Sequence, residues 1–144
     1  MLNTLTNKGE SKMDNDNKLV KDEKHNIEYF EANISYGGHN QWERNDKIFD
    51  NAPQGKYDDQ CCICNKGMST RYGTGYMTRG YTNPLMLVAE KDHKHLETNL
   101  SGCDMGTYFV GPECGKQIKK ALKEANLDWK KYIYYFNNKN RERA

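Results

Sequence analysis

Cys61-Cys62-Ile63-Cys64-Asn65-Lys66-Gly67 and Val110-Gly111-Pro112-Glu113-Cys114-Gly115-Lys116 are the two stretches that decide the fold. The first places the thiols of Cys61 and Cys64 across a short turn, and its Asn and Gly tolerate the tight backbone that wraps around a metal ion. The second places a third thiol, that of Cys114, at the start of a predicted helix. We interpret both stretches as parts of one zinc site that closes a small domain.

The composition of the chain supports the need for such a site. Its 144 residues are only 35% hydrophobic, with a mean hydropathy of -1.08. A small polar domain has little apolar core, so it needs a cross-link such as a metal site, which we call a staple. The five cysteines are an odd number, the N-terminus has no apolar signal segment, and no stretch has the roughly 20 apolar residues of a membrane span. We therefore expect a soluble, cytoplasmic protein whose thiols stay reduced and bind metal.

Charge is distributed unevenly along the chain. The net charge is only +2, but from Gly115 onward nine basic residues face three acids, so this end carries +6 and the remainder carries -4. Such an end is either an electrostatic footprint for an anionic partner or an ordinary solvated lysine-rich helix face. The candidate nucleic-acid contacts are Lys116, Lys119, Lys120, Lys123, Lys130 and Lys131.

The sequence of the first half of the chain predicts a disordered arm, then a strand, then a loop-rich connection. Residues 1–24 are almost entirely polar and predict a disordered N-terminal arm, in which Met13 is an alternative start. Order begins near residue 26, because apolar and polar residues alternate through Tyr36, as in a strand with one buried face. Residues 37–60 are expected to be mostly loop, with one short helical turn at 44–49.

The sequence in the middle of the chain predicts a hairpin of two strands over the metal site. Residues 70–78 are rich in Tyr and Thr and are broken by Gly, which is typical of a twisted strand. The apolar run at 84–89 is its expected partner. A polar excursion from Glu90 to Met105 follows, and residues 107–110 predict one more short strand.

The best-determined element is a helix after Gly111. Pro112 fits the first helical position, and the apolar residues Cys114, Ile118, Ala121, Leu122 and Ala125 recur on one face. Asn126 is expected to end this helix and Asp128 to cap a second one with an apolar stripe through Phe136. A strand at 132–136 is the alternative. The zinc domain is expected to span residues 25–137, and residues 138–144 form a basic C-terminal tail.

The order of knuckle, hairpin and a ligand on the first helical turn is that of a treble-clef zinc site. We therefore expect a small α+β fold, stapled by zinc, with short antiparallel strands and one or two C-terminal helices. Because the helix carries no second ligand pair, the fourth ligand stays open between Cys103, which we favour, and His93 or His95. Cys62 is not expected to be a ligand together with Cys61, since adjacent thiols cannot both point at one metal without distorting the turn; in a slipped assignment Cys62 would replace Cys61. The alternative to a metal site is a set of ordinary buried thiols.

Residues 60–122 resemble a group of small, mostly uncharacterised tailed-bacteriophage proteins. These proteins have a CxxCGK knuckle, a Tyr-rich hairpin and a Gly-Phe-Phe-x-Val-Gly-x-Glu-Cys-Ala-Lys-Lys-Ile helix start, to which residues 106–118 of this chain are similar. Their hairpin often carries a His that Tyr76-Met77-Thr78-Arg79 lacks. The resemblance implies a phage origin and a zinc-binding module.

The leading functional hypothesis is a non-catalytic, zinc-stabilised binding module. It would be a phage accessory protein that acts on a host protein or on nucleic acid, because a closed structural site leaves no position for substrate. For nucleic acid, the lysines lie beside Arg79, Tyr134 and Tyr135, which suit phosphate contact and base stacking.

Two catalytic functions are alternatives to the binding module. Asp92, His93 and the pair Asn99-Leu100 are similar to the signature of an HNH-like metal-dependent nuclease, but their spacing is too compact. A redox role for Cys61 and Cys64 lacks the strand before and the helix directly after the motif that a thioredoxin-like site needs.

Overall fold

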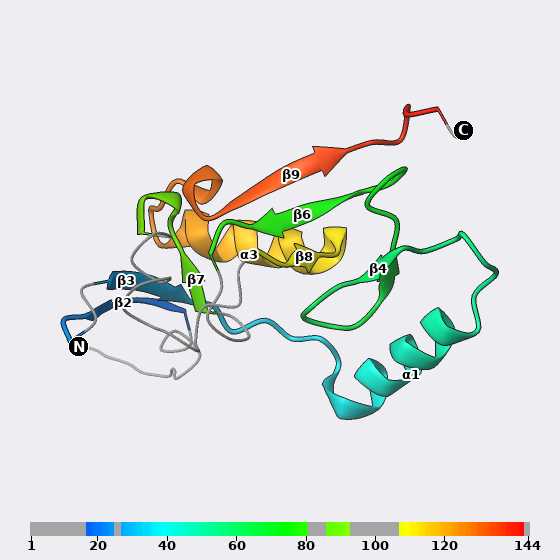
Figure 1. Ribbon diagram of the computed structural model, residues 1–144. Helices are drawn as coiled ribbons and strands as arrows, with labels where there is room; N and C mark the ends of the chain where they lie inside the picture. Colours follow the sequence, from blue (N-terminus) through cyan, green and yellow to red (C-terminus); the bar gives the residue numbers. More distant parts are fainter. Residues whose placement is uncertain (1–16, 25–26, 81–85, 93–106, 143–144) are drawn as a thin grey trace.

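The computed structural model describes residues 17–24, 27–80, 86–92 and 107–142. In this part of the chain, short antiparallel strands and two α-helices form a small α+β fold, as the sequence predicts (Figure 1). The strands are grouped into two three-stranded sheets and one two-stranded ribbon. None of the described helices is both long enough and apolar enough to cross a bilayer.

The first sheet has the order β2-β3-β7. Strand β2 (Lys18–Asp22) pairs with β3 (Ile27–Glu31) over five residues, and β3 pairs with β7 (Met86–Val88). The predicted alternation is confirmed as far as Ile34, because Phe30, Ala32 and Ile34 are buried, but Tyr36 is exposed and the strand itself ends at Glu31. The assignment of residues 1–24 to a disordered arm is wrong at 18–22: β2 gains order from its ladder with β3, although it buries little apolar surface itself.

The second sheet has the order β8-β6-β9. Strand β6 (Thr74–Thr78) lies in the middle, between β8 (Phe109–Val110) and β9 (Ile133–Asn137). The predicted strands at 70–78 and 107–110 are thus present, in part of each range. The predicted hairpin of residues 70–78 with residues 84–89 is wrong, since β7 pairs with β3, whereas β6 pairs with β8 and β9.

Helix α3 (Pro112–Glu124) confirms the strongest sequence prediction. Pro112 opens it, and one of its faces is buried through Cys114, Gly115, Ile118, Ala121 and Leu122, whereas Ala125 caps the helix and is exposed. Asn126 takes a left-handed conformation with φ of 62°, as expected of a helix terminator. At Gly115 the helix touches the ring of Tyr76 on β6, and a Cβ there would overlap that ring.

The segment after α3 differs from its prediction. Asp128 does cap a helix, since its side chain accepts a hydrogen bond from the backbone N–H of Lys130, but this is only the short 3-10 helix η3 (Trp129–Lys131). The chain then enters β9, so the second helix is wrong and the alternative strand is right. Five residues of β9 pair with β6, and this ladder outweighs the helical spacing of the aromatic residues. At the start of the predicted tail, Asn138 donates hydrogen bonds to Thr70 and Gly73.

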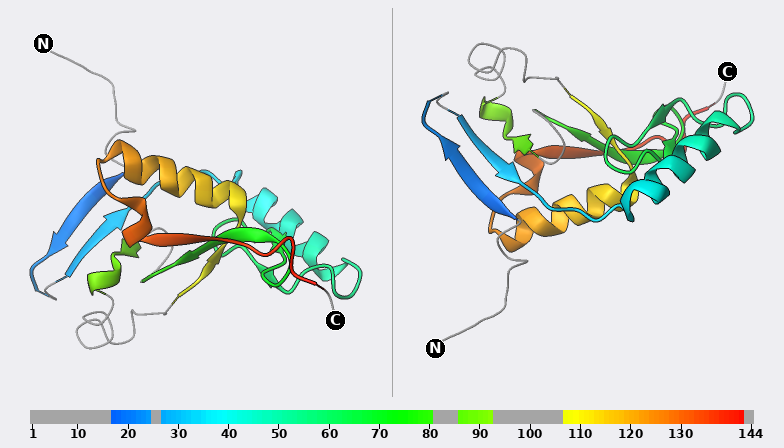
Figure 2. Two further views of the ribbon diagram at one scale, coloured as in Figure 1. Left: turned by 90° about the horizontal axis from the view of Figure 1, so that it is seen from above. Right: turned by 90° about the horizontal axis from the view of Figure 1, so that it is seen from below.

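Helix α1 (Gly38–Asp50) occupies most of the range expected to be loop. Its only buried residue is Asn45, so it presents almost no apolar period to sequence analysis. It lies beside the ribbon of β4 (Asp59–Gln60) and β5 (Gly67–Met68). Both views in Figure 2 show α3 between the two ends of the molecule, with its N-terminal end towards α1 and its C-terminal end towards β2 and β3.

Candidate metal centre and basic surface

The knuckle is a tight turn between β4 and β5. The backbone N–H of Cys61 donates to the carbonyl of Lys66 at 2.9 Å, and that of Asn65 donates to the carbonyl of Cys61 at 2.9 Å. Asn65 has a φ of 69°, which closes the turn in the left-handed region. The N–H of Ile63 also donates to the Sγ of Cys61 at 3.4 Å. This backbone curls around the two sulfur atoms of Cys61 and Cys64.

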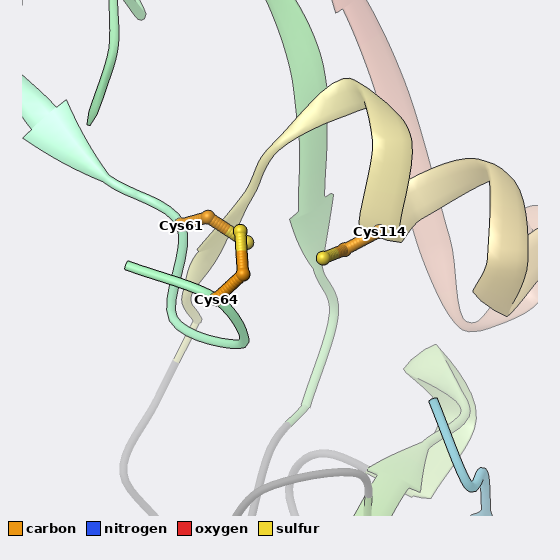
Figure 3. A group of neighbouring side chains, drawn as sticks. All are labelled: Cys61, Cys64 and Cys114. Atoms are coloured by element: carbon orange, nitrogen blue, oxygen red, sulfur yellow. The ribbon is translucent and has the colours of Figure 1, made fainter. Parts of the chain in front are cut away.

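Cys114 completes the cluster from the first turn of α3. The sulfur atoms of Cys61, Cys64 and Cys114 all lie within 4.8 Å of one another, and Figure 3 shows the Cys114 side chain directed from the helix towards the other two. Cys61 and Cys114 are buried and Cys64 is half-buried. All three are free thiols, so the group is able to bind a metal ion.

The thiols perturb one another because they are close and buried. Hydrogen bonds from the thiols of Cys114 and then Cys64, aided by the backbone N–H of Gly111, lower the pKa of Cys61. The hydrogen bond to Cys61, a second to Cys64 and burial all raise the pKa of Cys114. For Cys64 the hydrogen bond from Cys114 acts to lower the pKa, but Cys61 and burial outweigh it, and the pKa is raised. In the metal-free cluster these shifts favour ionisation of Cys61 ahead of Cys64 and Cys114.

Helix α1 holds the knuckle in place through the polar side chains of Asn45 and Asp46. The Nδ2 of buried Asn45 donates to the carbonyl oxygen of Cys64 at 3.0 Å. An Oδ1 of Asp46 accepts from Asn65 Nδ2 and from Gln60 Nε2, both at 3.0 Å, and the same Gln60 nitrogen reaches the Asn65 carbonyl at 2.9 Å. The turn that carries Cys61 and Cys64 is thus fixed from outside by polar contacts.

The sequence prediction of the three ligands agrees with this geometry, and Cys62 lies outside the cluster, as expected. Cys103, His93 and His95, the candidates for the fourth ligand, lie outside the described residues. A hollow of about 120 Å³ borders the cluster; Cys64 and Cys114 line it together with Lys66 and Glu113. Asn45, Asp46 and Gln60 could not be predicted, because isolated polar residues in a polar segment form no motif.

Four of the six lysines named as candidate nucleic-acid contacts lie together on the outer side of α3. A shallow hollow of about 330 Å³ is lined by Glu124 and by the four lysines at helical spacing, Lys116, Lys119, Lys120 and Lys123. The ammonium of Lys119 lies 4.6 Å from the centre of the Trp129 ring. Lys130 and Lys131 follow on η3, and both are exposed.

Other residues named for nucleic acid are arranged differently. Arg79 donates from Nε to the carbonyl of Lys130 at 2.7 Å and lies over the Tyr134 ring at 5.0 Å. Tyr135 is exposed, and its ring lies 5.1 Å from that of Tyr76. Of the nuclease-like residues, Asp92 ends the 3-10 helix η2 (Glu90–Asp92), and His93 and residues 99–100 lie outside the described residues.

Comparison with known proteins does not extend these observations: no family model, no curated protein and no solved structure matches the chain.

Proposed function

We propose that the protein is a non-catalytic binding module whose fold is stapled by a structural zinc ion and whose lysine-covered helix binds nucleic acid. The observation that carries this proposal is the cluster of three free thiols within 4.8 Å. Three soft ligands favour zinc among the common biological divalent ions, and a zinc ion held by protein ligands contributes directly to folding.

The arrangement of elements supports a treble-clef-like centre. A knuckle provides Cys61 and Cys64, β6 and β8 form an antiparallel pair, and α3 provides Cys114 on its first turn. A fourth ligand would approach through the hollow beside Cys64 and Cys114. Cys103 remains our candidate, with His93 and His95 as alternatives. The similarity of residues 60–122 to tailed-phage proteins supports the further proposal that this is a phage accessory protein.

The lysine face supports nucleic acid as the partner. Lys116, Lys119, Lys120 and Lys123 lie on the side of α3 opposite to its buried residues, so their charges are free to approach a phosphate backbone. The Lys119 side chain is already ordered by the Trp129 ring, which lowers the entropy lost on binding. Phosphate contacts by lysine release counterions and make affinity fall with salt.

The test is the salt dependence of binding to a fluorescent single-stranded and a fluorescent duplex oligonucleotide. We expect a triple variant, Lys116→Ala with Lys120→Ala and Lys123→Ala, to weaken binding and to flatten the slope of log affinity against log salt by about 0.7 to 0.9 per lost contact. The matched control is Lys21→Ala, which removes an exposed lysine from β2. Absence of binding at low salt, or an equal loss in the control, would exclude the lysine face as a nucleic-acid surface.

A further inference from the structure

An exposed aromatic side chain lies on the sheet that packs against α3. Tyr135, on the edge strand β9, is 47% exposed and is one of five exposed large hydrophobic residues in the described part of the chain. Its partner across the strand pair is Tyr76 on β6, and the centres of the two rings are 5.1 Å apart. Residues opposite each other in an antiparallel pair lie on the same side of the sheet. Tyr135 is therefore on the side where Tyr76 touches α3 at Gly115.

Ring contacts join Tyr135 to the lysine-covered side of α3. The buried ring of Tyr76 lies between Tyr135 and Trp129, since its centre is also 6.2 Å from that of Trp129 in an edge contact. The Trp129 ring in turn carries the ammonium of Lys119, 4.6 Å from its centre. Lys119 lines the same shallow hollow as the other lysines of α3. We call Lys119, Trp129, Tyr76 and Tyr135 the aromatic row; it leads from the lysines to an exposed ring.

The neighbouring Tyr134 is placed differently. Successive residues of a strand point to opposite faces of the sheet, so Tyr134 is on the side away from α3. Its ring is half-buried, and the guanidinium of Arg79 lies over it at 5.0 Å. Arg79 is itself held by its hydrogen bond to the Lys130 carbonyl and by its ion pair with Glu90 at 3.7 Å. Of the two tyrosines, Tyr135 is thus the one whose ring is on the lysine side and exposed to a ligand.

We propose that the nucleic acid bound by the lysines of α3 is single-stranded, and that one of its bases stacks on the Tyr135 ring while neighbouring phosphates contact the lysines. This inference rests on the proposed function of the same surface and names the form of its ligand. A base stacks on an aromatic side chain only when the face of that base is free, as in an unpaired strand. In a duplex, neighbouring base pairs cover those faces, so Tyr135 would add nothing to the phosphate contacts.

The first experiment compares three ligands of the full chain: a strand of about twelve thymidines, a duplex of the same length, and a strand of that length without bases. The two single strands carry equal numbers of phosphates, so the ratio of their affinities isolates the contribution of the bases. We expect the base-bearing strand to bind most tightly, about 5- to 150-fold more tightly than the abasic strand. Equal affinity for the two single strands, or tighter binding of the duplex, overturns the inference.

The second experiment assigns that contribution to one ring. Tyr135→Leu removes the ring but keeps an apolar side chain, whereas Tyr135→Phe keeps the ring. We expect Tyr135→Leu to lose the preference for the base-bearing strand and Tyr135→Phe to retain it, with the salt dependence unchanged in both because no phosphate contact is lost. The matched control is Tyr36→Leu, which removes a 38% exposed ring that does not line the lysine hollow. Equal affinities of the Leu and Phe variants at position 135 contradict stacking.

A third measurement needs no variant that alters the ring in the complex. The NMR signals of the Tyr135 ring protons, assigned by comparison with Tyr135→Phe, should move upfield when the wild-type chain binds the single strand and stay in place when it binds the duplex. Unmoved signals in the single-strand complex overturn stacking.

The outcomes separate this inference from the proposed function on which it rests. Binding that depends on salt and on the lysines, but not on the bases or on Tyr135, retains the lysine face as a nucleic-acid surface and overturns the stacking inference. Absence of binding to all three ligands at low salt overturns both.

Discussion

Asn45 is one of two residues of helix α1, with Asp46, that bond directly to the knuckle. Its side chain is only 6% exposed, and both of its polar atoms are used: Nδ2 donates to the Cys64 carbonyl, and Oδ1 accepts from Gln41. Leaving a buried amide unpaired costs free energy, and removing it leaves its partner, the Cys64 carbonyl, without a hydrogen-bond donor. It therefore fixes the position of Cys64 from outside the thiol cluster.

We predict that Asn45→Ala lowers the free energy of unfolding by about 1–3 kcal/mol, because the Cys64 carbonyl loses its donor. It should also weaken metal binding by about 10- to 100-fold, as is usual when a group that orients a ligand is removed. Urea denaturation and competition with a zinc chelator measure the two effects. Glu43→Ala on the same helix is the control, since it removes only an exposed contact with His39. Metal affinity unchanged in Asn45→Ala would contradict the proposed role.

The thiols give the stability of the metal-free protein a defined pH dependence. The pKa values of Cys64 and Cys114 are raised in the folded state, so these thiols stay protonated in the fold when an unfolded chain already loses their protons. The free energy of unfolding of the metal-free protein should therefore fall as pH rises above the ordinary cysteine pKa of 9.0. Bound metal keeps the three sulfurs deprotonated and should remove this loss.

Urea denaturation at about pH 8 and about pH 10.5, with and without stoichiometric zinc, measures this difference. Cys62→Ser should leave the difference unchanged, because Cys62 lies outside the cluster. The same pH dependence in the two forms would mean that the thiols do not meet at a metal.

At the scale of single residues, the sequence was most informative where spacing carries chemistry. The CxxC pair and a thiol on a helix start predicted the three clustered residues, because a metal site imposes both residue type and distance. The supporting contacts of Asn45 and Asp46 were not predictable, since they join segments about twenty residues apart through single hydrogen bonds. Such contacts leave no periodic signal.

At the scale of elements, β2 is the one whose contribution is easiest to isolate. Leu19 lies opposite Phe30, which is fully buried, and Val20 lies opposite Tyr29. We predict that a chain beginning at residue 25, which lacks β2, loses about 1–3 kcal/mol of unfolding free energy because β3 then becomes an edge strand. A chain beginning at Met13 keeps β2 and is the matched comparison. Equal thermal stability of the two chains would contradict a structural role for β2.

Helix α1, which the sequence did not predict, and β9, which it offered only as an alternative, share one physical cause. Helix α1 buries only Asn45, and β9 has aromatic residues whose spacing fits a helix as well as a strand. In both cases the structure follows from long-range contacts, of α1 with the knuckle and of β9 with β6. Helix α3 was predicted because proline, apolar period and terminator all agree locally.

At the scale of the whole molecule, α3 connects the features that matter for function. Its first turn provides Cys114, its inner face packs in the core with Ile118 and Leu122, and its outer face carries the lysines. A metal at the cluster would join α3 to the knuckle and would therefore stabilise the helix that carries the lysine face.

The most direct test of the central claim is the zinc content of the purified full chain, measured by mass spectrometry under native conditions. We predict one zinc per chain in the wild type and in Cys62→Ser, and loss of zinc with unfolding in Cys114→Ser. A wild-type chain that folds without any metal, or a Cys114→Ser variant that retains as much zinc as Cys62→Ser, would contradict the account.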